Sequence, residues 1–457
     1  MAPCEDWEYE MVNKLVAQGK LSIEFITQRL DSTIATGSGF PDEAKLELRH
    51  VFDTAANNEG LLTEPSLLVL LQRKSTIALS PELAEANKII FSALKYLSTL
   101  PFGPKIGTHV EGITFAEFSR ALVWILPETS GWLFEEDNFS RARKPADHRR
   151  LLFQSIALRH DHPLYEASIA RKLALRNAFN TDQEFGADLS AMNYDDDGDE
   201  SFHDLLEILY SSQDQIPGRL GARPDSLRPL AKRISTETDL PVIRTLGIPT
   251  ERFITLIRVL LAMQFHPPAT GEEPVNLLSF TPAAVAICAA FEAPDTHHLI
   301  THPSFESALE HLAPYLFDPL HQFLSLTFLG RTHGHLSANI DAPIHLSSTP
   351  SPDSILTIPL VAQLTAFLCW SFDYTSLEAH AMFTPSAPAE SASRLIKSLV
   401  PPNNFEPPAL LLLQGYSTVT SERVVFGLFT PHPDKGITSC HCPPPHIHPI
   451  CQCNSSD

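Results

Sequence analysis

Apolar residues recur every three or four positions along much of the chain, which is the spacing of amphipathic helices. In the N-terminal part Trp7, Met11 and Leu15 mark the first such helix, and Ser80 is placed to cap a later one. The helices predicted there lie at residues 5–18, 23–30, 41–52 and 81–100 and from Thr114 onward. This part is expected to be a helical bundle.

The same spacing returns after residue 224. It is clearest over residues 250–263, where Phe253, Leu256 and Leu260 share one face and Thr250 is the expected N-cap. Further helices are predicted at residues 224–234, 282–291, 304–312, 314–329 and 361–372.

The pattern changes near the end of the chain. Residues 409–415 (ALLLLQG) and 424–431 (VVFGLFTP) are apolar without alternation and are separated by a polar turn. Two such runs predict a β-hairpin in a fully buried sheet. Residues 434–457 are too rich in Pro, His and Cys to supply partner strands, so the sheet is expected to be cut off, with an open edge at residues 424–430.

These runs and two upstream motifs carry a family resemblance. The hairpin resembles the start of the sheet in a TLDc domain, and residues 311–320 (HLAPYLFDPL) and 96–102 (YLSTLPF) are similar to the fungal restriction-of-telomere-capping family of TLDc proteins. The resemblance implies a non-enzymatic protein that takes part in a process influencing telomere capping. It also implies action through protein partners, with subunits of the vacuolar proton pump and the oxidative-stress response as the suggested connections.

Together, pattern and resemblance predict a mostly α fold whose last domain is an incomplete α+β TLDc-like domain ending in the hairpin. The predicted division is a helical domain with a degenerate EF-hand-like helix pair at 1–180, an acidic linker at 181–225, a helical segment at 226–292, the partial TLDc-like domain at 296–435 and a disordered tail at 436–457.

Charge and hydropathy narrow the class of protein. With 33 basic and 54 acidic residues the net charge is -21, which argues against nucleic-acid binding. The longest apolar stretch, at residues 283–291, is half the length of a membrane span. The acidic first ten residues do not resemble a signal peptide, so a cytoplasmic protein without membrane insertion is predicted.

One acidic segment has the spacing of a calcium loop. Its candidate ligands are Asn193, Asp195, Asp197, Asp199 and Asp204, with Gly198 at the turn. Asp at the last position supplies fewer oxygens than Glu, which favours magnesium or weak calcium binding. The alternative is a solvated linker, because residues 181–207 hold many acids and no Lys or Arg. A cation-sensing adaptor built on this loop is therefore the alternative function.

A second loop resembles a calcium site less well. Asp53, Asn57 and Glu64 fall at its first, fifth and twelfth positions, but the third is Ala55 and the glycine is displaced to Gly60. A helix pair kept for packing is the favoured interpretation.

Cysteine and histidine residues offer few other candidates. Cys288 and Cys369 lie in apolar surroundings and are expected to be inert buried thiols. The tail combines Cys440, Cys442, Cys451 and Cys453 with three histidines, which suits either a disordered tail or a soft-metal site. The group His297, His298 and His302 has helical spacing but no carboxylate in register.

Catalytic motifs are missing from the sequence. The nearest match to a nucleophile elbow, Gly415-Tyr416-Ser417, lacks its second glycine, and phosphate-binding and dinucleotide-binding loops are absent. The sequence therefore predicts a protein without catalytic residues or cofactors, while an unrecognised hydrolase would have no residue to nominate.

Overall fold

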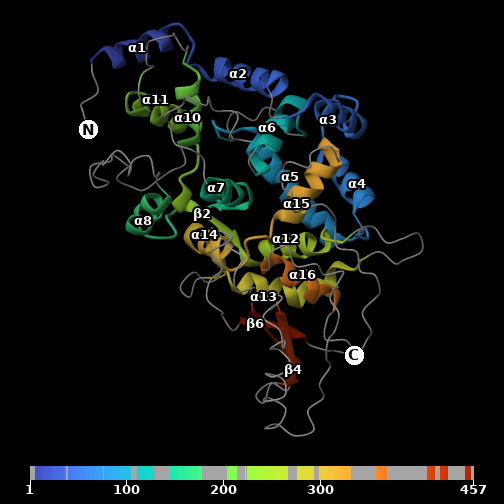
Figure 1. Cartoon of the computed structure of the whole chain (residues 1–457). Helices are drawn as coiled ribbons and strands as arrows, with labels where there is room; N and C mark the ends of the chain where they lie inside the picture. The colour runs from blue at the N-terminus through green and yellow to red at the C-terminus, as the bar shows by residue number, and fades with distance from the viewer. Residues whose placement is uncertain are drawn as a thin grey trace, which may run out of the picture.

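The structure is a computed structural model, and it describes the chain in segments. They are residues 6–37, 40–75, 77–103, 111–127, 129, 145–177, 203–213, 222, 224–265, 275–292, 298–330, 357–367, 409–416, 423–430 and 448–453, the last three as backbone only. These residues form a mostly helical body with short antiparallel sheets (Figure 1).

The predicted N-terminal helices are confirmed, with ends shifted by several residues, and two further helices, at residues 145–156 and 167–177, were not predicted. They are α1 (Asp6–Ala17), α2 (Ile23–Thr36), α3 (Asp42–Ala55), α4 (Glu64–Lys74), α5 (Pro81–Ser98), α6 (Phe115–Ile125), α7 (Pro145–Ile156) and α8 (Ala167–Asn177). The predicted cap is confirmed, since Ser80 Oγ accepts a hydrogen bond from Leu83 N at 3.2 Å.

The helices predicted after residue 224 are also confirmed, with shifted ends, and a helix that was not predicted, at residues 203–211, precedes them. They are α10 (His203–Ser211), α11 (Pro224–Glu237), α12 (Thr250–Ala262), α13 (Thr281–Ala289), α14 (His302–His311), α15 (Asp318–Leu324), the π-helix η6 (Ser325–Leu329) and α16 (Ile358–Phe367). The prediction of Thr250 as N-cap is wrong. Pro249 occupies that position in an extended conformation, and Thr250 is the first helical residue.

Buried apolar side chains form one cluster that runs from Val12 to Ala366. Helix α5 lies at its centre, against α4, α6, α7 and α12, and buries ten of its residues. The cluster is continuous across the predicted boundaries near residues 181–225 and 292–296. The predicted helical units therefore share one core.

Part of the predicted acidic linker is a core helix. In α10, Leu205 and Leu209 are fully buried, and α10 packs against α11. For residues 203–213 the linker prediction is therefore wrong. The apolar residues after Phe202 have helical spacing, and their burial outweighs the local acidity.

A small sheet joins segments far apart in the chain. The strands β1 (Leu158–Arg159), β2 (Leu246–Pro249) and β3 (Leu299–Thr301) pair antiparallel in the order β1-β2-β3. None was predicted, because strands of two to four residues are too short to show an alternating pattern.

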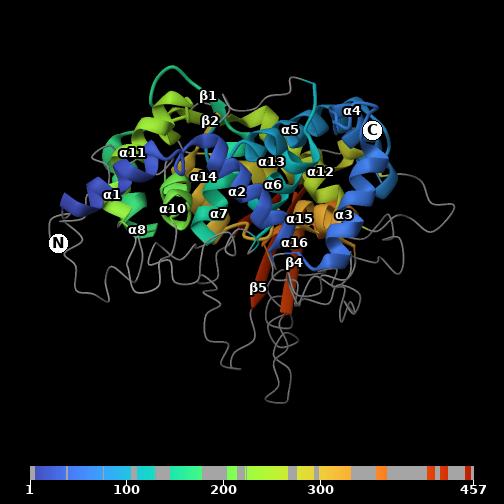
Figure 2. The same cartoon turned by 90° about the horizontal axis from the view of Figure 1, so that it is seen from above.

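The C-terminal hairpin is confirmed. β4 (Ala409–Tyr416) pairs antiparallel with β5 (Arg423–Thr430) along the full length of both strands. Both views show these strands projecting from the helical body (Figures 1 and 2).

The prediction that the tail could not supply a partner strand is wrong. β6 (His448–Cys453) pairs with β5, and it lies against α13 and α16. Strand pairing uses backbone groups, so it does not require an alternating sequence. Pro449, which lacks an N–H, sits next to a register shift between Val424 and Phe426, where the loss of a ladder bond is tolerated.

Among the residues described, no helix is long and apolar enough to cross a membrane.

Candidate functional site

Asp204, the last ligand of the predicted cation loop at residues 193–204, is paired with an arginine instead. Asp204 is 2% exposed, and both of its carboxylate oxygens accept hydrogen bonds from the Arg150 guanidinium at 2.9 Å. A carboxylate held in this bidentate way is not free to bind a cation. The assignment of Asp204 as a ligand is therefore wrong, while Asn193, Asp195, Asp197 and Asp199 lie outside the described residues.

Helix α7 instead carries two neighbouring arginines that tie it to other helices. Arg150 pairs with Asp204 of α10 and also donates to Gln154 at 3.1 Å. Arg149 pairs with the fully buried Glu306 of α14 at 2.6 and 2.9 Å. These charge-assisted bonds join α7 to α10 and α14.

The loop between α3 and α4 is part of a larger arrangement. Leu62 at its end forms an antiparallel bridge with Ile113, which precedes α6, through two backbone hydrogen bonds of 2.9 Å. Thr63 and Thr114 follow these residues and cap α4 and α6. Two helix-loop-helix units, α3–α4 and α5–α6, are thus paired through their loops, as in an EF-hand pair.

The first loop is closed by its own side chain. Asn57 Oδ1 accepts hydrogen bonds from Glu59 N and Leu61 N, both at 3.0 Å. Asp53 lies in the last turn of α3 and pairs with Arg49 at 2.8 Å. Two of the predicted ligands of this loop, Asp53 and Asn57, are therefore already engaged by other groups of the chain.

The predicted register of this loop is also wrong. Gly60 has φ 74°, the left-handed conformation that the glycine at the sixth position of a calcium loop provides. Counting from Gly60 places Ala55 at the first position and Ser66 at the twelfth, so neither Asp53 nor Glu64 holds a ligand position.

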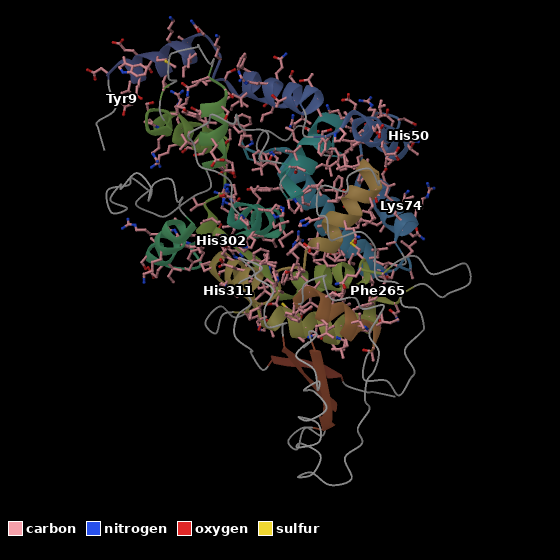
Figure 3. The ribbon with its side chains drawn as sticks, in the orientation of Figure 1. Tyr9, His50, Lys74, Phe265, His302 and His311 are labelled. Carbon is pink, nitrogen blue, oxygen red and sulfur yellow. The ribbon has the colours of Figure 1, made fainter. Side chains whose placement is uncertain are left out.

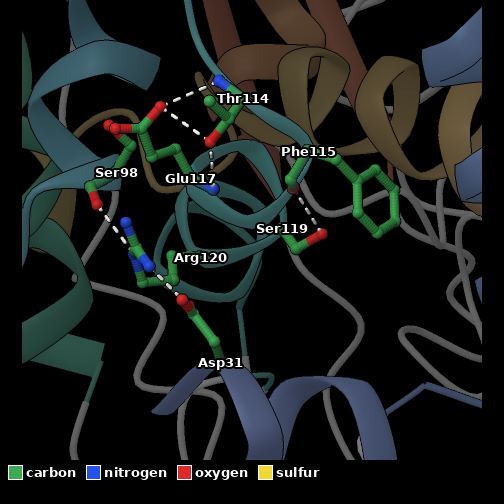
Figure 4. Close-up of polar contacts among 7 residues, drawn as sticks. All are labelled: Asp31, Ser98, Thr114, Phe115, Glu117, Ser119 and Arg120. Atoms are coloured by element: carbon green, nitrogen blue, oxygen red, sulfur yellow. Dashed lines mark hydrogen bonds and ion pairs between the residues drawn. The ribbon is translucent and has the colours of Figure 1, made fainter. Parts of the chain in front are cut away.

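The second helix-loop-helix unit, α5–α6, was not predicted from the sequence. Its loop could have been recognised by a repeated pair, an aliphatic residue followed by a capping threonine, which occurs as Leu62-Thr63 and again as Ile113-Thr114. In this unit Glu117 forms a capping box: its carboxylate accepts from Thr114 N and Oγ1, both at 2.8 Å (Figure 4).

One small cavity lies beside this box. Arg120 is one of its lining residues and donates hydrogen bonds to Ser98 O at 3.0 Å and to Asp31 of α2 (Figure 4). Its other lining residues include Thr27, Leu30 and Phe102. The cavity has room for about one water molecule, far below the size of a substrate pocket.

Two histidines are buried in the described core. His302 is the first residue of α14 (Figure 3). Its ring centroid lies 5.2 Å from that of Phe153. Burial, aided by Arg150 and Arg149, lowers its pKa to about 3. His321 of α15 lies against His148, and burial followed by this neighbour lowers its pKa well below 6.5. Both are neutral at physiological pH.

The remaining candidates do not gather into a site. Cys288 is buried as predicted, and burial raises the pKa of its thiol to about 12. His297 and the side chains of the tail cysteines are not among those that the structure describes. Within the described segments, no group of three or more His, Cys, Asp or Glu side chains could hold a metal ion.

The hydrogen bonds of Asn57 lead to a prediction about the stability of the first loop and its response to calcium. Replacing Asn57 by alanine leaves two loop N–H groups without their acceptor and is expected to cost about 1 to 2 kcal/mol in the free energy of unfolding. Urea titration measures this cost, with the exposed Asn13→Ala in α1 as the control. Adding calcium is expected not to change the melting temperature of the protein without the substitution. A calcium-dependent rise that disappears in Asn57→Ala would show that the loop binds the ion.

No family model matches this sequence, and searches of curated proteins and of solved structures also found no match. The resemblance to TLDc proteins is therefore carried only by the motifs given above.

Proposed function

We propose that this protein is a non-enzymatic, cytoplasmic adaptor of the TLDc type, which acts by binding a protein partner and so influences telomere capping. The partner in this proposal is a subunit of the vacuolar proton pump, as the resemblance implies.

The observation that supports this proposal is the order of the C-terminal sheet. β4 is an outer strand of the order β4-β5-β6, eight residues long, and among the described strands it pairs only with β5. An outer strand offers a row of backbone donors and acceptors to an added strand, which is a common way for a domain to bind an extended segment.

The buried charges of the helical body are consistent with a binding role. Arg150, Arg149 and Arg120 each pair with a carboxylate from another helix. These groups hold helices together and do not surround a substrate-sized cavity.

The alternative of a cation-sensing adaptor gains no support from the described residues. Its last ligand, Asp204, is held by Arg150, and the first helix-loop-helix unit closes its loop with Asn57.

Binding to the purified peripheral sector of the vacuolar proton pump tests the proposal. We expect the full chain to bind with a dissociation constant of about 1 μM or below, and Leu412→Lys to weaken binding at least about tenfold by placing a charge on the outer strand. The matched control is Leu46→Lys, the same change on an exposed position of α3. The proposal fails if the full chain does not bind, or if both variants bind equally well.

A further inference from the structure

The strand β6, which the structure describes by its backbone, carries two cysteines at alternate positions, Cys451 and Cys453. Successive residues of a strand lie on opposite faces, so residues two apart lie on the same face. Gln452, between the two cysteines, pairs with Val424 of β5. Cys451 and Cys453 therefore share one face of the sheet.

The extended backbone of β6 favours a pair of free thiols over a disulfide between these cysteines. Two residues of a strand span about 6.8 Å between Cα atoms, which is at the upper end of the range in which disulfides form. Two thiolates at this separation can hold one metal ion between them, because each bond from sulfur to the ion adds about 2.3 Å. Thiolate ligands select soft ions such as copper(I) and zinc.

The number of ligands on the strand distinguishes these two ions. His448 is the next candidate ligand and pairs with Gly427, whereas Cys453 pairs with Arg423, four residues earlier in β5. About 13 Å of strand thus separates His448 from Cys453, which is too far for both to reach one ion. Two thiolates satisfy copper(I), while structural zinc requires four ligands.

The register of β5 and β6 also places a positive charge near the cysteines. Arg423 lies directly opposite Cys453, and residues opposite each other in paired strands share a face. A neighbouring arginine favours the thiolate form of a cysteine. Two thiolates and one copper(I) ion leave one negative charge for the arginine to offset, whereas a doubly charged ion would leave none.

We propose that Cys451 and Cys453 of β6 form a binding site for a soft, singly charged metal ion of the copper(I) class, with the two thiolates sharing one ion. Among the described strands β6 pairs only with β5, so its second edge is not paired there. The site lies at the opposite edge of the sheet from β4 and does not rest on the proposed function.

Competition with the chromogenic copper(I) chelator bicinchoninate tests the site on the full chain under anaerobic, reducing conditions. The unchanged chain is expected to take up about one equivalent of copper(I). A chain with both Cys451→Ser and Cys453→Ser should bind the ion at least about tenfold more weakly. The matched control, Cys440→Ser with Cys442→Ser, changes the other Cys-x-Cys pair and should bind within about threefold of the unchanged chain.

Moving one cysteine tests whether the strand itself sets the site. Gln452→Cys combined with Cys453→Gln keeps both thiols but puts them at adjacent positions, on opposite faces of the strand. This chain should bind copper(I) at least about tenfold more weakly than the unchanged chain. His448→Ala should leave the affinity within about threefold, because His448 is too far from Cys453 to share its ion.

Three results would overturn the proposal. Equal affinity of the exchanged and unchanged chains would show that the thiols bind without the strand. An equal loss of binding in the Cys440→Ser, Cys442→Ser chain would place the site elsewhere in the sequence. Stoichiometric uptake of zinc in place of copper(I) would show that the metal class is wrong.

Discussion

Asp204→Asn is expected to lower the free energy of unfolding by about 3 to 5 kcal/mol, the cost of leaving a buried charge without its partner. Arg150 is 2% exposed, and its guanidinium donates to both oxygens of Asp204 at 2.9 Å. The neutral amide presents an NH2 group to one of these donors. The remaining carboxylate, Asp147, lies 3.6 Å from Arg150 and compensates only in part. Urea unfolding followed by circular dichroism measures the loss.

Two controls distinguish this effect from a general sensitivity to mutation. Asp53→Asn breaks the exposed pair with Arg49 and is expected to cost no more than about 1 kcal/mol. Replacing both members, with Arg150→Met and Asp204→Leu, should recover part of the stability, because neither member of the pair is left as a buried charge, although Asp147 loses its contact with Arg150. A cost below about 1 kcal/mol for Asp204→Asn would mean that Arg150 is not desolvated as described.

Acidification is expected to destabilise the protein through His302 and His321. Both imidazoles are neutral in the fold, with the pKa of His302 lowered to about 3 and that of His321 lowered well below 6.5, chiefly by burial. The unfolded chain takes up these protons near pH 6.5 and the folded chain does not. The stability is therefore present above that pH and falls as the pH falls, by about 2 kcal/mol for His302 between about pH 7.5 and pH 5, and in the same direction for His321.

Thermal and urea unfolding across this range check the sign and the size. His302→Leu should flatten the dependence by about 1.4 kcal/mol per pH unit below pH 6, and His321→Leu should change it in the same direction. His50→Leu, at an exposed position of α3, is the control for the effect of a histidine-to-leucine change as such. An unchanged slope in both buried variants would show that these imidazoles are protonated in the fold.

The sequence by itself determined most helices and the hairpin, because their signals are local. The apolar stripe of α12 and the Ser80 cap of α5 depend on residues within one or two turns. Two apolar runs around a polar turn likewise define β4 and β5 without reference to the rest of the chain.

Only the tertiary structure decided the features that depend on partners distant in sequence. Asp204 looks like a cation ligand until Arg150, 54 residues earlier, takes both of its oxygens. β6 becomes a strand because β5 offers it an unpaired edge, and Leu62 meets Ile113 only when α3–α4 and α5–α6 are packed together. Such pairings use backbone groups and buried charges, and the contribution of each group to stability depends on the partner opposite it. The spacing of residues along the chain does not reveal which partner that will be.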